Sequence, residues 1–230
     1  MNIKVNDMDK QLFSQAIAKY LAGVVLVGVL IFLPAGTLNF RNGWILMAIL
    51  FVPMFCAGMV MLYKSPDLLR KRLNAKEKEM EQKTVVALSG LMFLAAFILA
   101  GLNYRFRWTT LPDAVIYISA GLFLLSYVLY AEVMRENAYL SRTIEVQEDQ
   151  TVVDTGLYGI VRHPMYAATL LLFLSMPLVL GSLPSFAVML AYIPIIVKRI
   201  LNEEEVLEEG LKGYKEYKEK VRYRIIPFVW

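Results

Sequence analysis

The chain of 230 residues contains only one cysteine and one histidine. A single thiol cannot form an internal disulfide, and one histidine with one cysteine cannot supply the ligands that a zinc or haem site requires. Cys56 lies in an apolar stretch, where a small buried side chain is its ordinary role. These shortages exclude a disulfide scaffold and a metal site built from Cys and His, and we predict no bound metal.

Charge is absent from long parts of the chain. The first four uncharged stretches each have the length that a helix needs to cross a hydrocarbon core of roughly 30 Å. The fifth is too long for one crossing, and its Gly-Ser-Leu-Pro-Ser run at 181–185 predicts a tight helical hairpin. A signal peptide is the alternative for the first stretch, but that stretch lacks an A-x-A cleavage pattern and a second apolar segment follows it closely. The uncharged stretches are 21–40, 42–63, 84–104, 114–131 and 164–197.

The sequence therefore predicts an all-α integral membrane protein with about six transmembrane helices, or five if the last apolar pair is partly re-entrant. Lys and Arg are frequent near the N-terminus and in 64–83, whereas the first connection holds only Arg41. The positive-inside rule then places both termini in the cytoplasm, with 135–163 and 198–230 on the same side. The net charge of +4 indicates lipid headgroups rather than nucleic acid as the partner.

The lone histidine lies in the run Arg162-His163-Pro164-Met165-Tyr166, where a polar segment meets the fifth apolar stretch. Proline costs little in the first turn of a helix, because that N–H has no partner within the helix. The polar segment before it contains Gly156 and Gly159, which permit unusual backbone angles, and is longer than most structureless connections. We interpret the segment as functional; an ordinary connecting loop is the alternative.

A second polar cluster follows the last apolar stretch. Arg199 and Glu203 are four residues apart and so share a helix face, although an exposed ion pair of this kind is often only a solvated helix end. The predicted hairpin brings both of its outer ends to one membrane face, so His163 and the acidic run 203–205 should lie within one pocket. Residues 213–230 are aromatic and basic, which predicts an interfacial amphipathic helix that also covers this pocket.

Together these motifs resemble the isoprenylcysteine carboxyl methyltransferase family, in its bacterial type, which is related to the phospholipid N-methyltransferases. The resemblance covers 137–230 and predicts a division into four membrane helices (1–133) and a methyltransferase core with a cytoplasmic cofactor-binding cap (134–230). Two departures are Leu157, where the family often has proline, and Ala168, where it often has glycine. The matching motifs are Gly156-Leu157-Tyr158-x-x-Val161-Arg162-His163-Pro164-Met165-Tyr166, Glu203-Glu204-x-x-Leu207, Gly213-Tyr214-x-x-Tyr217 and Arg222-Tyr223-Arg224-Ile225-Ile226-Pro227.

The resemblance implies S-adenosylmethionine as methyl donor, held without a Rossmann domain, and the sequence indeed has no Gly-rich loop of the dinucleotide-binding kind. It implies that Arg199 steers the acceptor and that His163 either positions the reactants or acts as a base. A base is needed only for an acceptor that must lose a proton, such as an amine. The implied cofactor-binding residues are Gly156, Tyr158, Arg162, His163, Pro164, Tyr166, Glu203 and Glu204.

The methyl acceptor should come from the bilayer or be small and apolar. A prenylcysteine carboxylate, a phospholipid amine, a small thiol and an isoprenoid acid remain open, as does the oligomeric state. Two other functions are alternatives. A sterol-type reductase that uses NADPH has a similar layout with an Arg-His-x-Asn-Tyr motif, whereas this chain has Pro164 and Met165 and an acidic run. A transporter would place ionisable groups within its spans, and the apolar stretches have none.

Overall fold

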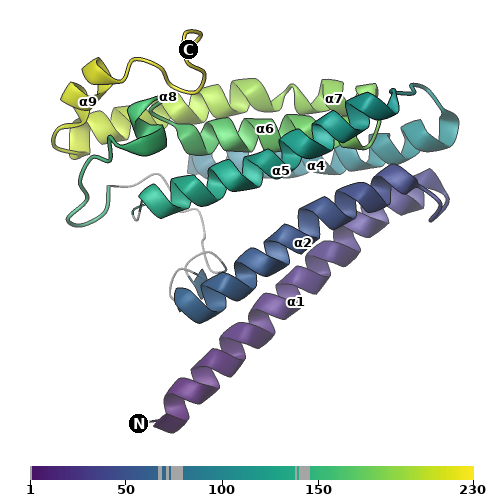
Figure 1. The fold of residues 1–230 in the computed structure, drawn as a ribbon, viewed down its shortest axis with the longest axis horizontal. Coiled ribbons are helices and arrows are strands. Elements are labelled where there is room, and N and C mark those ends of the chain that lie inside the picture. Colours follow the sequence, from purple (N-terminus) through teal and green to yellow (C-terminus); the bar gives the residue numbers. More distant parts are fainter. Residues whose placement is uncertain (1, 67–68, 71–72, 74–79, 138, 140–145) are drawn as a thin grey trace.

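The computed structural model describes residues 2–66, 69–70, 73, 80–137, 139 and 146–230. Across these residues all the regular elements are helical, which confirms the predicted all-α class (Figure 1). The elements are α1 (Asn2–Ala35), α2 (Arg41–Lys64), α4 (Met80–Phe106), α5 (Asp113–Glu136), the 3-10 helix η1 (Gly156–Gly159), α6 (Pro164–Val179), α7 (Leu183–Met189), α8 (Tyr192–Gly210) and α9 (Tyr214–Lys220).

Within the described residues, five helices are long and apolar enough to cross a membrane. The sixth expected span is α6, which has only 16 residues. At 1.5 Å per residue α6 is about 24 Å long, less than a hydrocarbon core of about 30 Å. The expected count of six is therefore corrected to five, the alternative count. The five helices are Gln11–Ala35, Arg41–Lys64, Ala87–Phe106, Asp113–Glu136 and Leu183–Gly210.

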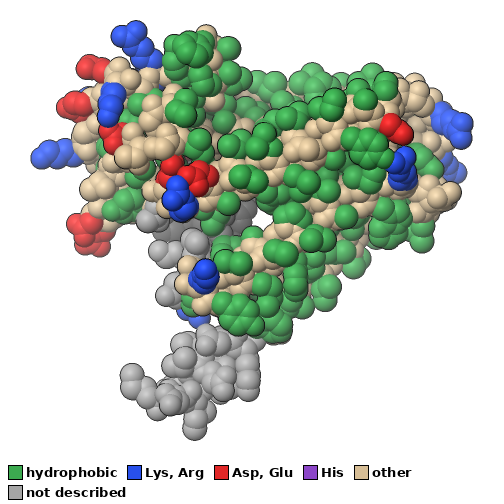
Figure 2. All heavy atoms as spheres, in the orientation of Figure 1, with side chains coloured by type: hydrophobic (Ala, Val, Ile, Leu, Met, Phe, Trp, Pro, Cys, Tyr) green, Lys and Arg blue, Asp and Glu red, His purple; other side chains and the backbone are tan. Residues whose placement is uncertain are grey.

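Apolar side chains cover the middle of the molecule, and Lys, Arg, Asp and Glu gather toward its two ends (Figure 2). This is the pattern that a helix bundle in a bilayer requires, because hydrocarbon favours apolar side chains and the headgroup regions accept charge. The described chain is therefore an integral membrane fold. The orientation, with both termini on the cytoplasmic side, stays a prediction from the Lys and Arg distribution.

The expected hairpin between α6 and α7 is confirmed. Gly181 adopts a left-handed φ of +73°, and the Ser182 hydroxyl caps α7 by accepting from the Ser185 N–H at 3.2 Å. The Ser185 hydroxyl donates to the Ala96 carbonyl at 2.8 Å, and the Asn103 amide donates to the Gly181 carbonyl at 3.2 Å. These hydrogen bonds pair polar groups of the turn with protein partners and attach the turn to α4.

Close helix packing supports this frame. A Cβ placed on Gly101 of α4 would lie 2.5 Å from the Ile31 carbonyl oxygen of α1, so only glycine allows these two helices to approach so closely. Small residues serve this purpose in membrane bundles, where packing rather than water exclusion holds helices together. The main core cluster extends from this contact through α5 and α6 to Ile196 and Ile200 of α8.

The alternation of helix directions brings distant segments together at one end of the bundle. Figure 1 shows the end of α5, η1, the start of α6, the end of α8 and α9 at that end, far from the α6–α7 turn. The predicted gathering of 135–163 and 198–230 is therefore confirmed in the described residues. The segment 64–83, which its Lys and Arg content also places on this side, lies half outside the described residues.

Candidate active site

The site begins where α6 begins. His163 is the residue before the helix and Pro164 occupies its first position, as the motif predicts. The backbone N–H groups of Arg162 and His163 donate to the carbonyls of Tyr223 and Arg224, each at 2.8 Å. These two bonds attach the C-terminal segment to the entrance of α6, so residues about sixty positions apart along the chain form one wall.

Glu204 on α8 is the centre of a buried ion cluster. Its Oε1 accepts from Arg162 Nε at 2.8 Å and lies 3.1 Å from His163 Nε2, while its Oε2 accepts from Arg224 Nε at 2.9 Å. Only 2% of Glu204 is exposed, and Arg162 and His163 are also buried. Such a charge is tolerated in the interior because each of its oxygens has a charged or polar partner. The cluster therefore joins α6, α8 and the C-terminal segment.

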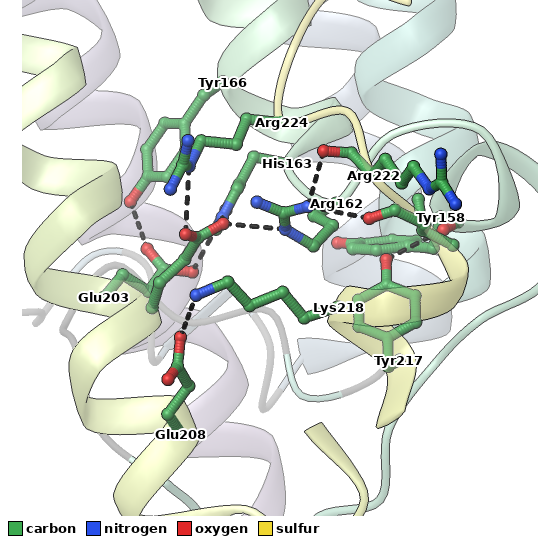
Figure 3. A network of polar contacts seen from close by, with 12 residues as sticks. Tyr158, Arg162, His163, Tyr166, Glu203, Glu208, Tyr217, Lys218, Arg222 and Arg224 are labelled. Carbon is green, nitrogen blue, oxygen red and sulfur yellow. Dashed lines mark hydrogen bonds and ion pairs between the residues drawn. The ribbon is translucent and has the colours of Figure 1, made fainter. Parts of the chain in front are cut away.

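Arg162 belongs to the same buried ion cluster, and its side-chain donors bond within it and to the C-terminal segment. Besides Glu204, its Nη1 donates to the carbonyl oxygens of Val221 at 2.7 Å and Arg222 at 2.8 Å (Figure 3). The guanidinium groups of Arg162 and Arg224 would repel each other without the Glu204 carboxylate between them. Glu204 and Arg162 are thus bound primarily to each other and to the C-terminal segment.

Glu203 belongs to a different environment from Glu204. The Tyr166 hydroxyl donates to Glu203 Oε2, and Arg199 Nε donates to the Tyr166 oxygen at 3.0 Å. His163 Nδ1 lies 3.9 Å from Glu203 Oε1, so the imidazole stands between the two glutamates. The Glu203 side chain is 25% exposed and faces an open pocket.

The pocket lies among η1, α6, α8 and α9 and holds about 840 Å³ of empty space, including its open mouth. Arg199, Glu203 and Leu207 line it from successive turns of α8, since residues four apart share a helix face. The other face of α8, with Ile196, Ile200 and Glu204, is buried. The remaining lining residues are Asn137, Tyr139, Gln150, Thr151, Val152, Val153, Tyr158, Arg162, His163, Met165, Tyr166, Leu211, Tyr214 and Tyr217.

The pocket brings together most of the predicted site residues. Its lining includes Tyr158, Arg162, His163, Tyr166, Arg199 and Glu203, and it does not include Gly156, Pro164 or Glu204. Pro164 is buried at the start of α6. Glu204 lies behind the pocket lining and bonds to Arg162, which lines the pocket. The proximity of the lone histidine to the acidic run is confirmed, whereas a role of each residue toward a cofactor stays a prediction.

The contact between η1 and Glu136 at the end of α5 explains why leucine stands at 157, where the family often has proline. The φ of Gly156 is +52°, and a Cβ there would lie 1.4 Å from Glu136 Oε1. The neighbouring Leu157 N–H donates to Glu136 Oε2 at 2.9 Å. A proline at 157 would have no N–H to donate. Leucine at this position therefore allows the end of α5 to hold η1 through a carboxylate.

Three tyrosines form the end of the pocket near α9. The Tyr217 hydroxyl donates to the Tyr158 backbone carbonyl at 2.8 Å. The Tyr158 hydroxyl oxygen accepts from the Asn137 side-chain amide at 3.0 Å. Burial raises the pKa of Tyr158 to about 12 and raises the pKa of Tyr217 and of Tyr214 further. All three phenols are therefore neutral hydrogen-bonding groups at physiological pH.

Tyr214 differs from the other two tyrosines. It is 4% exposed, and its hydroxyl has no hydrogen-bond partner among the described residues. A buried polar group without a partner costs roughly 1–3 kcal/mol of stability, so such groups are rare and call for an explanation. The sequence predicts an interfacial helix at 213–230, whereas the rings of Tyr214 and Tyr217 are buried in the protein.

Sequence reasoning also missed Asn137, Gln150 and Thr151 in the pocket lining and Arg224 as a partner of Glu204. Arg224 lies in the motif Arg222-Tyr223-Arg224, and this Arg-x-Arg spacing was the available signal. The three other residues carried no signal, because polar side chains in a long connection have no periodicity that relates them to α8.

Known proteins resemble this chain in sequence over residues 114–213 and in fold over nearly its whole length. The family model described as "Phospholipid methyltransferase" matches residues 114–213, which begin in α5 and include most of the pocket lining. The solved structure of the eukaryotic intramembrane Ras methyltransferase ICMT (isoprenylcysteine carboxyl methyltransferase) is similar over 99% of this chain and 85% of that one, with a TM-score of 0.59 and 20% identity. Residues 114–213 thus match the phospholipid methyltransferase model, and the chain has an ICMT-like fold.

These two findings confirm the family resemblance that the motifs indicated; the bacterial type stays a prediction. A third similarity concerns Delta(14)-sterol reductase of Mus musculus, which is 31% identical over 91 residues. The matched part is 38% of this chain and 22% of the reductase, so the chain spans only about a fifth of that relative's length.

Proposed function

We propose that this protein transfers a methyl group from S-adenosylmethionine to a membrane-borne or small apolar acceptor. The observation that carries the proposal is the position of the pocket: most of its lining lies within the residues that match the phospholipid methyltransferase model, at one end of an apolar helix bundle. The acceptor's reactive group is a carboxylate, a thiol or an amine. Following the Lys and Arg distribution, we assign this end to the cytoplasmic face.

The residues of the pocket fit the chemistry of the donor. S-adenosylmethionine carries an ammonium, a carboxylate, a sulfonium and an adenosine, and when bound it supplies an electrophilic methyl group. Glu203 would hold the ammonium through a charge-assisted hydrogen bond. The faces of Tyr158 and Tyr166 would favour a cationic sulfur.

We assign Arg162 and Glu204 a supporting role. Both are held in the buried ion cluster and fix the positions of His163 and of the C-terminal segment. Gly156 and Pro164 act similarly, by shaping η1 and the start of α6. The protein's contribution to the reaction is then mainly to fix two reactants at a productive distance, which can lower a barrier substantially.

His163 serves in positioning rather than as a general base. Its Nε2 lies within hydrogen-bond distance of Glu204, and its Nδ1 is directed to the side of Glu203, so both ring nitrogens face carboxylates. Its side chain is also 4% exposed, which leaves little access for an acceptor's proton. Arg199, at the pocket wall next to Tyr166, is the residue that we expect to steer an acidic acceptor.

A reductase that uses NADPH is the second candidate, because 91 residues of this chain are 31% identical to the sterol reductase. The pocket's charged groups favour the methyl donor. Glu203 would repel a nucleotide phosphate, while it would attract the ammonium of an amino acid.

A ligand-binding comparison tests the two candidates. The full-length protein in detergent should be stabilised by S-adenosylhomocysteine and not by NADPH, as seen in a shift of the melting temperature. Membranes containing the protein should then transfer labelled methyl groups from S-adenosylmethionine into the lipid extract, and mass spectrometry of the extract identifies the acceptor. Stabilisation by NADPH alone would overturn the proposed function in favour of reduction.

A further inference from the structure

A short apolar turn, residues 226–229, follows α9 and exposes large side chains. No side chain in 225–230 is charged. Ile226, Phe228 and Val229 are 52%, 87% and 74% exposed. Water disfavours such a surface, because apolar area gains free energy when it leaves water. A contiguous exposed apolar surface of this kind indicates an apolar partner.

The backbone of the apolar turn is folded onto itself. The Trp230 oxygen accepts from three consecutive N–H groups, those of 224–226, at 2.9, 3.0 and 3.2 Å. The Ile226 carbonyl accepts from the N–H groups of Val229 and Trp230 at 3.2 and 3.1 Å. Pro227 has no N–H to pair. Backbone that enters lipid needs partners for its polar groups, and this turn supplies most of its N–H groups with partners from within.

The base of the turn is fixed to the protein and to the site. Ile225 is buried in the main core, and Trp230 packs partly against that core. The Arg224 guanidinium lies 5.0 Å from the centre of the Trp230 ring, and its Nε bonds to Glu204. The Arg224 carbonyl accepts from the His163 N–H. The exposed apolar side chains therefore project from an ordered support.

The turn lies toward the apolar part of the bundle. Figure 1 shows the chain leaving α9 at one end of the molecule and returning toward its middle. In Figure 2 the apolar side chains of this returning segment adjoin the apolar middle of the molecule. The side chain of Arg222, just before the turn in sequence, is exposed. Apolar side chains beside a cation suit the boundary between acyl chains and anionic headgroups.

We propose that residues 226–229 insert into the lipid interface on the side of the pocket, and that this turn, not α9, is the part of 213–230 that contacts the membrane. Tyr214 and Tyr217 already use the apolar face of α9 within the protein. The other side chains of α9 are all charged, which leaves none for lipid: Lys215, Glu216, Lys218, Glu219 and Lys220.

Insertion of the turn sets the position of the site relative to the bilayer. The carbonyls of Tyr223 and Arg224 accept from the N–H groups of Arg162 and His163, and both of these residues line the pocket. The depth of the turn in lipid therefore fixes the height of this wall against the membrane surface. The inference does not depend on which reaction the pocket carries out.

Nitroxide labels on single cysteines measure the depth of the turn. Cys56→Ala removes the one native cysteine. The full-length protein is then labelled at Val229→Cys, Glu216→Cys or Val128→Cys in nanodiscs of phosphatidylcholine with phosphatidylglycerol. Val128, 64% exposed on the membrane helix α5, is the reference for lipid, and Glu216, exposed on α9, is the reference for water.

Electron paramagnetic resonance compares collisions of each label with oxygen, which concentrates in lipid, and with a water-soluble nickel complex. The Val229 label should collide mainly with oxygen, as the Val128 label does, and the Glu216 label mainly with nickel. A second label at Phe228→Cys repeats the measurement at the most exposed side chain of the turn. Equal melting temperatures of the labelled variants in detergent show that each is folded.

Each other outcome contradicts the proposal. Labels at 228 and 229 that meet nickel as often as the Glu216 label does would place the turn in water. Labels shielded from both reagents would mean that protein covers the turn. A Glu216 label that collides mainly with oxygen would place α9 in lipid and contradict the division of roles between the helix and the turn.

Discussion

Glu203 and Glu204 are neighbours in sequence and differ in almost every physical respect. Glu204 is enclosed by Arg162, His163 and Arg224 and supports the wall of the pocket, whereas Glu203 contacts Tyr166 and faces the pocket itself. A helix turns by 100° per residue, so adjacent side chains necessarily face different surroundings. One carboxylate is thus part of the structure that holds the site, and the other is available to a ligand.

The largest effect should follow from Glu204→Ala. Removing this carboxylate leaves two arginines and a histidine without their shared partner, and breaking a buried charge pair costs about 3–5 kcal/mol. We expect a strongly lowered melting temperature in detergent and detachment of the C-terminal segment, visible as faster proteolysis there. Glu205→Ala, at an exposed position on the same helix, is the control. Equal stability of the two variants would remove the structural role of Glu204.

Glu203→Gln should produce the opposite pattern. The side chain is partly exposed, and glutamine keeps a hydrogen-bond acceptor for Tyr166, so the melting temperature should change little. Loss of a charge-assisted bond should weaken S-adenosylhomocysteine binding about tenfold to a hundredfold in calorimetry. If this variant binds normally but unfolds early, the contrast between the two glutamates is wrong.

Gly156→Ala tests how the end of α5 holds η1. An alanine Cβ would collide with the Glu136 carboxylate, and the φ of +52° is unfavourable for any residue with a side chain. We expect the hydrogen bond from the Leu157 N–H to the Glu136 carboxylate to be lost. The free energy of unfolding should fall by about 1–3 kcal/mol. Gly121→Ala in α5 is the matched control, because nothing lies within 4 Å of its added Cβ. Similar melting temperatures for the two variants would contradict the collision.

The smallest effect should come from Lys220→Ala. Lys220 and Asp154 form an ion pair of 2.6 Å, but their side chains are 66% and 42% exposed. The hydrogen bond from Lys220 lowers the pKa of Asp154, so any stabilisation is present at neutral pH and is lost as the pH falls below the aspartate range. Exposed pairs contribute little, and the melting temperature at neutral pH should be unchanged. A clear decrease would mean that α9 depends on this contact.

Much of the site could be predicted from the sequence because its parts are local patterns. Proline after the lone histidine predicted a helix start, and the uncharged run with its Gly-Ser-Leu-Pro-Ser break predicted the hairpin. A hairpin returns its outer ends to one face, so the proximity of His163 to the acidic run followed from topology alone. The count of membrane helices was less secure, since the lack of charge at 164–197 does not show where α6 ends.

The division of roles between neighbouring residues could not be predicted. Nothing in the local pattern distinguishes Glu203 from Glu204, or Tyr214 from Tyr217, because the difference depends on which way each side chain faces in the folded protein. Arg224 became a partner of Glu204 only because the C-terminal segment binds along the entrance of α6 through backbone bonds.

The sequence by itself determined the class of fold and the end of the bundle at which the polar groups gather, because hydrophobicity and helix length act locally and through the bilayer. The tertiary structure alone decided which carboxylate is neutralised, which phenol lacks a partner and which apolar side chains after α9 stay exposed. Those properties depend on contacts between residues that are tens of positions apart, and such contacts exist only once the helices have packed.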